Sequence, residues 1–184
     1  MSLPTIIAVC GYKGSGKDTI AKYLEEKYDY THIKITKPLK DCVQNLFNLT
    51  EEQIEKNKEQ IDKRYGVSPR QLYQFFGTEI MQYQIQQIIP TMSKKFWINR
   101  FIDEYFNKTN VKYIISDLRF LHEYEELKKY NCEFWLVESN HVITNDKHIS
   151  ENEYKKIPVN YTIKNTKDIE YLYLQIDNRL AVVK

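Results

Sequence analysis

Short apolar runs alternate along this chain with longer segments whose apolar residues recur every three to four positions. The short runs, which are rich in β-branched residues, predict buried strands at 5–10, 31–35, 111–116, 132–137 and 161–164. The longer segments predict helices that begin after Gly16, near Pro38 and after Ser68, and further helices at 80–89, 96–106, 123–130 and 168–180. Strands that alternate with helices form parallel sheets through right-handed crossovers. The pattern therefore predicts an α/β fold with a parallel sheet of about five strands.

Three parts of the pattern need a closer look. The segment 50–65 is highly charged and has little apolar periodicity, so it is either a solvated helix or a mobile segment. Ser68 and Pro69 are typical of a helix N-terminus, and Gly77 is expected to interrupt the helix that follows. Trp97 lies in an aromatic stripe at helical spacing, which more often belongs to a core than to a base-stacking site. We therefore expect Trp97 in the core.

The composition limits the kinds of partner. The chain has 184 residues, which fits one domain, and a formal net charge of +2. Its basic residues are interspersed with acids, so the concentrated basic face of a nucleic-acid-binding protein is not expected. The sequence shows neither a signal peptide nor about 18 consecutive apolar residues, so no membrane span is expected. Three cysteines without metal-ligand or redox spacing favour the cytoplasm, and we expect all three to be buried (Cys10, Cys42 and Cys132).

A glycine-rich turn follows the first predicted strand. Gly11, Gly16 and Lys17 have the spacing of a phosphate-binding loop, but Asp18 stands where a Ser or Thr hydroxyl normally contacts a metal. Backbone N–H groups and the positive end of the next helix can bind phosphate oxygens there, and Lys17 adds a charge. Thr19 can supply the missing hydroxyl. The alternative is an ordinary strand-to-helix turn in which Asp18 only stabilises the helix dipole.

Other candidate sites follow strands or lie on helices. Asp117 and Arg119 come at the end of a buried strand, where open α/β sheets bind ligands, although they could also form a simple salt bridge. Arg70 and Gln74 share one helix face, as phosphate and base recognition requires, or are merely solvated. His148 lies in a polar stretch that could form a flap or could simply be exposed.

These residues and several further motifs make the chain resemble one family, the phage-type deoxynucleoside monophosphate kinases of the P-loop NMP kinase group. The motifs lie, in chain order, at 13–19, 38–41, 70–79, 96–97, 117–119, 122–123, 148–151 and 163–165. The resemblance spans nearly the whole chain. It implies a single three-layer α/β/α domain over 1–184, in which about 38–106 hold a helical acceptor-binding region and about 139–157 form a short lid.

The resemblance also implies the residues of the donor site and of catalysis. It implies ATP-phosphate binding by Gly14, Gly16, Lys17, Asp18 and Thr19. It implies catalytic roles for Lys13, Lys17, Asp117 and Arg119. It implies Mg²⁺ as the cofactor, held by Thr19 and, through water, by Asp18 and Asp117.

The remaining implied residues bind the acceptor or belong to the lid. The resemblance implies acceptor binding by Lys13, Leu39, Lys40, Arg64, Arg70, Gln74 and Glu79. It implies lid roles for His148 and Glu151. The lid departs from expectation because it contains no Arg, and its basic residues are Lys147, Lys155, Lys156 and two histidines.

The function implied by the resemblance is transfer of the γ-phosphoryl group of ATP to a deoxynucleoside monophosphate (dNMP). The partners are then ATP and a dNMP, and whether the chain forms a homodimer stays open, as do base preference and selection of deoxyribose. One alternative is a small-molecule kinase like the animal phosphomevalonate kinases, which share a related loop and a strand-end Asp-x-Arg. Another is a non-catalytic nucleotide-binding regulatory module, which Asp18 and the Arg-free lid favour. A GTPase-type switch is not favoured, since no Asn-Lys-x-Asp motif is present.

Overall fold

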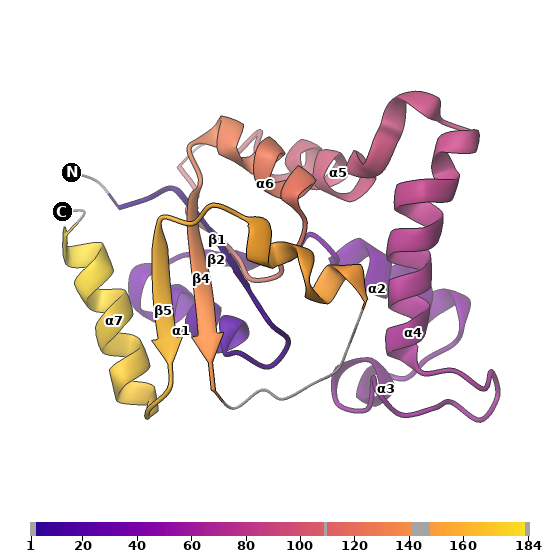
Figure 1. The fold of residues 1–184 in the computed structure, drawn as a ribbon, viewed down its shortest axis with the longest axis horizontal. Helices are drawn as coiled ribbons and strands as arrows, with labels where there is room; N and C mark the ends of the chain where they lie inside the picture. The colour runs from indigo at the N-terminus through magenta and orange to yellow at the C-terminus, as the bar shows by residue number, and fades with distance from the viewer. Residues whose placement is uncertain (1–2, 109, 141–147, 183–184) are drawn as a thin grey trace. The chain divides into compact units, whose positions relative to one another are not determined.

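The computed structural model describes residues 3–108, 110–140 and 148–182 (Figure 1). The chain divides into two compact units, one formed by 1–34 with 105–184 and the other by 35–104.

The first unit is built on a parallel sheet. Its strands are β1 (Ile6–Gly11), β2 (Thr31–Ile33), β3 (Tyr113–Ile115), β4 (Glu133–Ser139) and β5 (Tyr161–Asn165). They are arranged in the order β2-β3-β1-β4-β5, and every pairing is parallel. This confirms the predicted α/β fold with five parallel strands. Because β1 lies between β3 and β4, the chain after β1 leaves the sheet at a topological switch point, where such sheets bind ligands.

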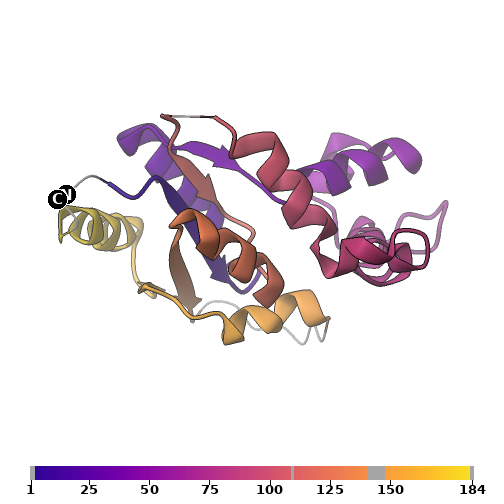
Figure 2. The ribbon, with the colours of Figure 1, turned by 90° about the horizontal axis from the view of Figure 1, so that it is seen from above.

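Helices cover both faces of this sheet (Figure 2). Successive residues of a strand point to opposite faces, so each strand contacts both layers of helices. Ile7 and Val9 of β1 belong to a buried core shared with α1 (Lys17–Tyr28) and α7 (Ile169–Val182). On the other face, the ring of Phe134 lies 4.6 Å from that of Tyr124 in α6 (Leu121–Leu127). Burial on both faces is what a parallel sheet requires, and it gives the expected three layers.

Several short 3₁₀ helices of the first unit were not predicted. The helix η4 (Lys128–Tyr130) continues α6, so together they match the predicted helix at 123–130. The helices η5 (Ile149–Glu151) and η6 (Glu153–Lys156) lie between β4 and β5. Helices this short have little periodicity of their own.

The second unit is helical. Its elements are α2 (Lys37–Leu46), α3 (Glu51–Glu55), α4 (Pro69–Gln74), the π-helix η1 (Phe75–Tyr83), the 3₁₀ helices η2 (Gln84–Gln87) and η3 (Pro90–Lys95), and α5 (Phe96–Tyr105). This unit overlaps the region 38–106 for which acceptor binding is predicted.

The expected interruption at Gly77 is wrong. The helical backbone continues from α4 through Gly77 in η1. A Cβ atom on Gly77 would lie 2.5 Å from Cδ2 of Leu39, and the indole Nε1 of Trp97 donates a hydrogen bond to the Gly77 carbonyl at 3.0 Å. Close packing therefore leaves no room for a side chain at position 77, which explains the glycine. Trp97 is 8% exposed, which confirms its expected core position.

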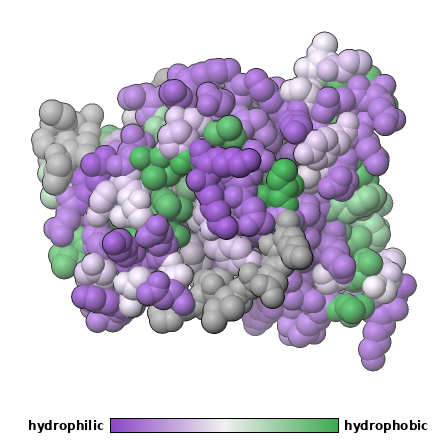
Figure 3. Space-filling model, viewed as in Figure 1, coloured by the Kyte–Doolittle hydropathy of each residue, from purple (hydrophilic) through white to green (hydrophobic). Residues whose placement is uncertain are grey.

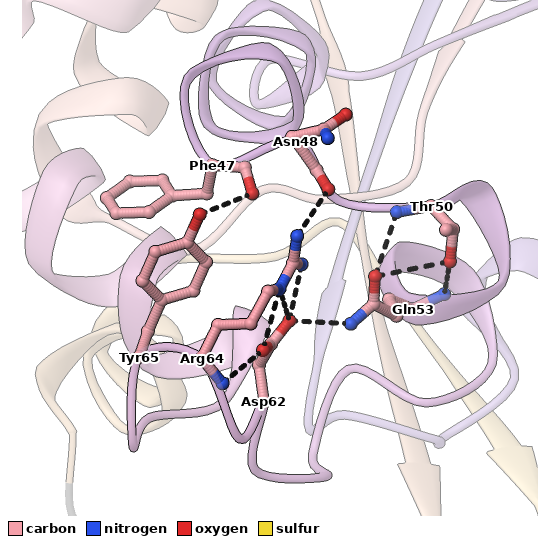
Figure 4. Close-up of polar contacts among 7 residues, drawn as sticks. All are labelled: Phe47, Asn48, Thr50, Gln53, Asp62, Arg64 and Tyr65. Atoms are coloured by element: carbon pink, nitrogen blue, oxygen red, sulfur yellow. Dashed lines mark hydrogen bonds and ion pairs between the residues drawn. The ribbon is translucent and has the colours of Figure 1, made fainter.

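The charged segment 50–65 does not form one continuous solvated helix. It begins with the short helix α3, which Thr50 caps through a reciprocal pair of contacts with Gln53. Turns follow, and a β-bridge joins Asp62 to Val67. Side-chain contacts hold these turns, as Figure 4 shows.

Two of the three cysteines are buried. Cys10 and Cys132 are buried as expected, but Cys42 is exposed, so that part of the expectation is wrong.

The face drawn in Figure 3 is mostly hydrophilic, with apolar residues in small separate groups. Across 3–108, 110–140 and 148–182, no helix is both long enough and apolar enough to cross a membrane.

Candidate functional site

The phosphate-binding loop between β1 and α1 is packed closely against the ends of neighbouring strands. Gly11 and Gly16 have φ of +144° and +105°, in the region that favours glycine. A Cβ atom on Gly11 would lie 2.6 Å from the Val137 carbonyl of β4. A Cβ atom on Gly16 would lie 2.6 Å from Nδ2 of Asn165, which donates a hydrogen bond to the Ser15 carbonyl at 2.9 Å. The loop is thus shaped by β4 and β5, and the sequence analysis assigned no role to Asn165.

Lys17 is buried at the centre of this loop. Its Nζ donates hydrogen bonds to the carbonyls of Gly11 at 2.9 Å and Tyr12 at 2.6 Å. Burial, together with the positive charge of Arg119, lowers the pKa of Lys17 to about 7. A buried ammonium whose hydrogen bonds go to neutral carbonyl oxygens would gain from a nearby anion, such as a phosphate.

The loop also contains a buried hydroxyl with no partner. Ser15 is 1% exposed, and its Oγ forms no hydrogen bond within the part of the chain that the structure describes. Buried polar atoms are normally satisfied, so one without a partner in a loop of this shape supports a ligand there.

The Asp18 carboxylate lies in a polar network that sequence analysis missed. Its Oδ1 accepts a hydrogen bond from Oγ of Ser116 at 2.7 Å and lies 2.9 Å from Nζ of Lys34. The Nε2 atom of His32 lies 2.7 Å from the same Ser116 hydroxyl. Although desolvation acts to raise the pKa of Asp18, Lys34 and Ser116 lower it overall. Thr19, the next residue of α1, is half-buried.

Three missed residues of this network, His32, Lys34 and Ser116, come at or just after the C-terminal ends of β2 and β3. Their positions at strand ends were the only indication in the sequence, since ligands bind at that edge of a parallel sheet.

Asp117 and Arg119 follow β3, and the main chain around Arg119 is fixed by a buried acid. Asp117 is 7% exposed. The backbone N–H groups of Arg119 and Phe120 donate hydrogen bonds to Oε2 of Glu123 at 2.9 and 3.0 Å. Burial raises the pKa of Glu123 to about 8, although these two hydrogen bonds act to lower it. The charges of Arg119, Asp18 and Asp117 all act on Lys17, so these four side chains lie near one another in the first unit. Their shared catalytic role stays a prediction.

The predicted lid is only partly described. Residues 141–147, which include Lys147, lie outside the described residues. His148 caps η5, since its Nδ1 accepts a hydrogen bond from the Ser150 N–H at 3.2 Å. Lys155 and Lys156 are exposed, whereas Glu151 is buried and forms an ion pair with Arg119.

The predicted acceptor residues of the second unit lie in α2, α4, η1 and the turns between them. Nζ of Lys40 lies 3.2 Å from Oε1 of Glu55, and Nε of Arg70 lies 3.5 Å from Oε1 of Glu59. The side chain of Arg70 is only 11% exposed.

Three further acceptor candidates differ in burial. Leu39 is 6% exposed and packs over Gly77. Gln74 in α4 is half-buried, and Glu79 in η1 is exposed. Lys13, the candidate that belongs to the first unit, is half-buried in the loop. The acceptor roles of all these residues stay predictions.

Arg64 has a structural partner in this unit (Figure 4). Its Nε and Nη2 donate to the two carboxylate oxygens of Asp62 at 3.0 and 2.6 Å, and its Nη1 donates to the Asn48 carbonyl at 3.2 Å. Gln53 donates to the same carboxylate at 2.7 Å and accepts from the Thr50 N–H at 2.9 Å. Arg64 therefore joins Asn48, two residues after the end of α2, to the turn at 62–65. Its acceptor role stays a prediction.

The carboxylate and hydroxyl oxygens near the loop suit Mg²⁺ when the phosphates of a bound nucleotide supply further ligands. Among the described residues, no three or more His, Cys, Asp or Glu side chains form a group that could hold a metal ion. Carboxylate and hydroxyl oxygens, such as those of Asp18, Thr19 and Asp117, are nevertheless what Mg²⁺ prefers when substrate phosphates complete its coordination.

Comparison with known proteins identifies the family of the chain. A family model described as deoxynucleotide monophosphate kinase matches residues 5–66 and 49–176. A protein of Acanthamoeba polyphaga mimivirus, named "Putative deoxynucleotide monophosphate kinase", is 30% identical over 180 residues, which cover 93% of each chain. Two solved structures share the fold at low identity. TT1252 from Thermus thermophilus has a TM-score of 0.53 at 14% identity and covers 100% of both chains. A gluconokinase from Sinorhizobium meliloti 1021 has a TM-score of 0.52 at 12% identity and covers 100% of this chain and 95% of its own. The family match and the mimivirus relative, together with the loop around Lys17, show that the chain is a kinase of the deoxynucleotide monophosphate kinase family.

Proposed function

We propose that this kinase transfers the γ-phosphoryl group of ATP to the 5′-phosphate of a dNMP and releases ADP and the deoxynucleoside diphosphate. The observation that carries the proposal is the buried Lys17 ammonium, held by loop carbonyls 2.9 and 2.6 Å away in a chain of this family. Such an ammonium is suited to the β- and γ-phosphates of a donor nucleotide.

In this proposal the loop binds the donor phosphates. Backbone N–H groups around Gly14 and Gly16 contact phosphate oxygens at the N-terminus of α1, and the ammonium of Lys17 neutralises them. The acceptor phosphate is already a nucleophile, so the reaction needs no strong general base. Catalysis then depends on alignment and on neutralisation of charge by Lys13, Lys17 and Arg119.

Mg²⁺ fits the oxygen groups of the loop as a cofactor that binds together with ATP. We assign its coordination to the hydroxyl of Thr19 and, through water, to the carboxylates of Asp18 and Asp117. The ion would neutralise charge on the phosphates. The ion pair between Asp18 and Lys34 keeps the Asp18 carboxylate ionised, as water-mediated coordination requires.

The acceptor nucleotide is assigned to Lys13 and to residues of the second unit. The cationic side chains of Lys40, Arg64 and Arg70 would meet the acceptor phosphate or the charged parts of the nucleotide. Leu39, Gln74 and Glu79 would contact the nucleoside. The family match favours a deoxynucleotide over phosphomevalonate as the acceptor.

The test is formation of ADP from ATP with a panel of acceptors that contains dNMPs, ribonucleoside monophosphates and phosphomevalonate. We expect turnover with at least one dNMP, and we expect Lys17→Ala and Arg119→Ala each to lower kcat by about 10³-fold or more while leaving a measurable residual rate. Lys22→Ala is the control, because Lys22 lies in α1 but is 74% exposed and pairs with the exposed Glu26 at 3.6 Å. Tight ATP binding without turnover of any acceptor would favour the regulatory alternative, and turnover of phosphomevalonate alone would favour the other kinase.

A further inference from the structure

The carboxylate of Glu151 is buried against the guanidinium of Arg119. Glu151 is 1% exposed and Arg119 is 23% exposed at its side chain. Nη1 of Arg119 donates hydrogen bonds to Oε1 of Glu151 and, at 3.3 Å, to the Ser150 carbonyl. A buried carboxylate is costly unless it is paired and hydrogen-bonded, so this contact fixes both side chains.

The segment that carries Glu151 is itself held in place. Its 3₁₀ turn is capped by His148, and Nδ2 of Asn152 donates to the His148 carbonyl at 3.1 Å. Two residues beyond Glu151, the carboxylate of Glu153 accepts a hydrogen bond from the Leu121 N–H at 3.1 Å. The segment 148–153 therefore contacts the chain around Arg119 at two points.

Arg119 is thus fixed at both its backbone and its side chain, next to the phosphate-binding loop. Glu123 accepts the Arg119 N–H, while Glu151 accepts from the guanidinium. Arg119 lies close enough to Lys17 for its positive charge, together with burial, to lower the pKa of Lys17. A cation in this position can act on phosphates bound at Lys17 without first losing the rotamer freedom of a long side chain.

We propose that Glu151 is a positioning residue, which orients the guanidinium of Arg119 for stabilising charge during phosphoryl transfer. This role rests on the proposed kinase reaction. This role explains how a segment without Arg contributes to catalysis. The segment 148–153 supplies the Glu151 carboxylate, which holds the guanidinium of Arg119 just after β3. Glu151 does not itself contact the nucleotides.

The test compares Glu151→Gln with Glu153→Gln, a matched control in the same segment whose carboxylate contacts only a backbone N–H of the 119–121 turn in the described structure. For Glu151→Gln we expect kcat to fall roughly 10- to 100-fold, the size of effect that misplacing a catalytic group produces. The Kd of a fluorescent ATP analogue and the KM for ATP should stay within about threefold of wild type, because Arg119 acts mainly in the transition state. Glu153→Gln should keep kcat within about twofold.

Two further variants separate positioning from a merely structural role. In an Arg119→Ala background, Glu151→Gln should change residual kcat by less than about twofold, since its effect passes through Arg119. Glu151→Asp, which keeps the charge, should recover part of kcat and carries the test if Glu151→Gln does not fold.

The outcomes are distinct. Equal kcat for Glu151→Gln and wild type, or an equally large loss in the Arg119→Ala background, would overturn the positioning role. A wild-type protein that phosphorylates no dNMP would instead overturn the proposed function. The same variants would then be compared by their acceptor-independent ATP hydrolysis, where an unchanged rate in Glu151→Gln again contradicts positioning.

Discussion

The side-chain amide of Asn165, at the end of β5, donates a hydrogen bond to the Ser15 carbonyl of the phosphate-binding loop over 2.9 Å. This contact joins parts of the chain that are 150 residues apart. It also brings the Asn165 amide against Gly16, where no Cβ could fit without a shift. The end of β5 thus holds the phosphate-binding loop through this hydrogen bond.

Replacing Asn165 with Leu should weaken ATP binding. The variant keeps the number and branching of the side-chain heavy atoms but leaves the Ser15 carbonyl without its donor, and losing such a bond costs about 1 to 3 kcal/mol. We expect the Kd of a fluorescent ATP analogue to rise roughly tenfold, which corresponds to about 1.4 kcal/mol. Asn160→Leu is the control, because Asn160 bonds to the Phe134 N–H and not to the loop. Equal ATP affinity in Asn165→Leu and wild type would show that β5 does not support the loop.

The low pKa of Lys17 should make ATP binding depend on pH. In the free protein this pKa is lowered from 10.5 to about 7, so the ammonium loses its proton above about pH 7. Bound phosphates favour the charged form and raise the pKa in the complex. The affinity should therefore fall as pH rises, with the Kd approaching a tenfold increase per pH unit above about 7.

The measurement is a titration with a fluorescent ATP analogue between pH 6 and 9 at constant ionic strength. Lys17→Arg is the comparison, because a guanidinium stays charged throughout this range and should give a much flatter profile. A wild-type Kd that is constant from pH 7 to 9 would mean that Lys17 keeps its proton in the free protein.

Sequence patterns located the loop correctly because its requirements are local. The spacing of Gly11, Gly16 and Lys17 after an apolar run is enough to predict a strand, a phosphate-binding turn and a helix. The partners of Asp18 could not be predicted in the same way. Ser116 is 98 residues away and meets Asp18 only because β3 lies beside β1 in the sheet.

Gly77 shows the opposite case, in which a local rule failed. Glycine disfavours a helix by about 1 kcal/mol relative to Ala, which made an interruption the natural expectation. The contacts with Leu39 and Trp97 come from segments 38 and 20 residues away and were invisible to that rule. Tertiary packing therefore decided the backbone at this position.

The ion pair between Lys34 and Asp18 should lower the pKa of the Asp18 carboxyl group at the start of α1. Nζ of Lys34 lies 2.9 Å from Oδ1 of Asp18 and helps to lower its pKa below 3.8. In Lys34→Met we expect that pKa to rise. A carboxyl group whose pKa is lower in the folded state stabilises that state at pH values above its unfolded pKa, and this stabilisation is lost as the pH falls. The variant should therefore be less stable than wild type at pH 7. The difference in stability should shrink below about pH 4.

Carbon-13 NMR titration of the Asp18 carboxyl measures this pKa, and urea unfolding at several pH values measures the stability. Lys22→Met is the control, because its exposed pair with Glu26 lies on the same helix. An unchanged Asp18 pKa in Lys34→Met would mean that Ser116 and His32, and not Lys34, hold this pKa low.

The contact between Gly77 and Leu39 predicts that two destabilising substitutions will partly cancel. Gly77→Ala places a methyl group 2.5 Å from Cδ2 of Leu39, and overpacking of this kind costs about 1 to 3 kcal/mol. Because the gain in helix propensity is only about 1 kcal/mol, the single variant should lose stability. Leu39→Ala alone leaves a cavity and should cost about 2 to 5 kcal/mol.

In the double variant the new methyl group occupies part of the space that Leu39 leaves. Its loss of unfolding free energy, measured with urea, should be smaller than the sum of the two single losses by about 1 kcal/mol or more. Gly66→Ala is the contrast, because Gly66 has φ of +70° and no atom within 4 Å of its Cβ position. The cost there comes from backbone strain, so Leu39→Ala should add to it without compensation. Additive losses for Gly77→Ala and Leu39→Ala would show that the helix tolerates a side chain at 77 and that the close packing is not what selects glycine.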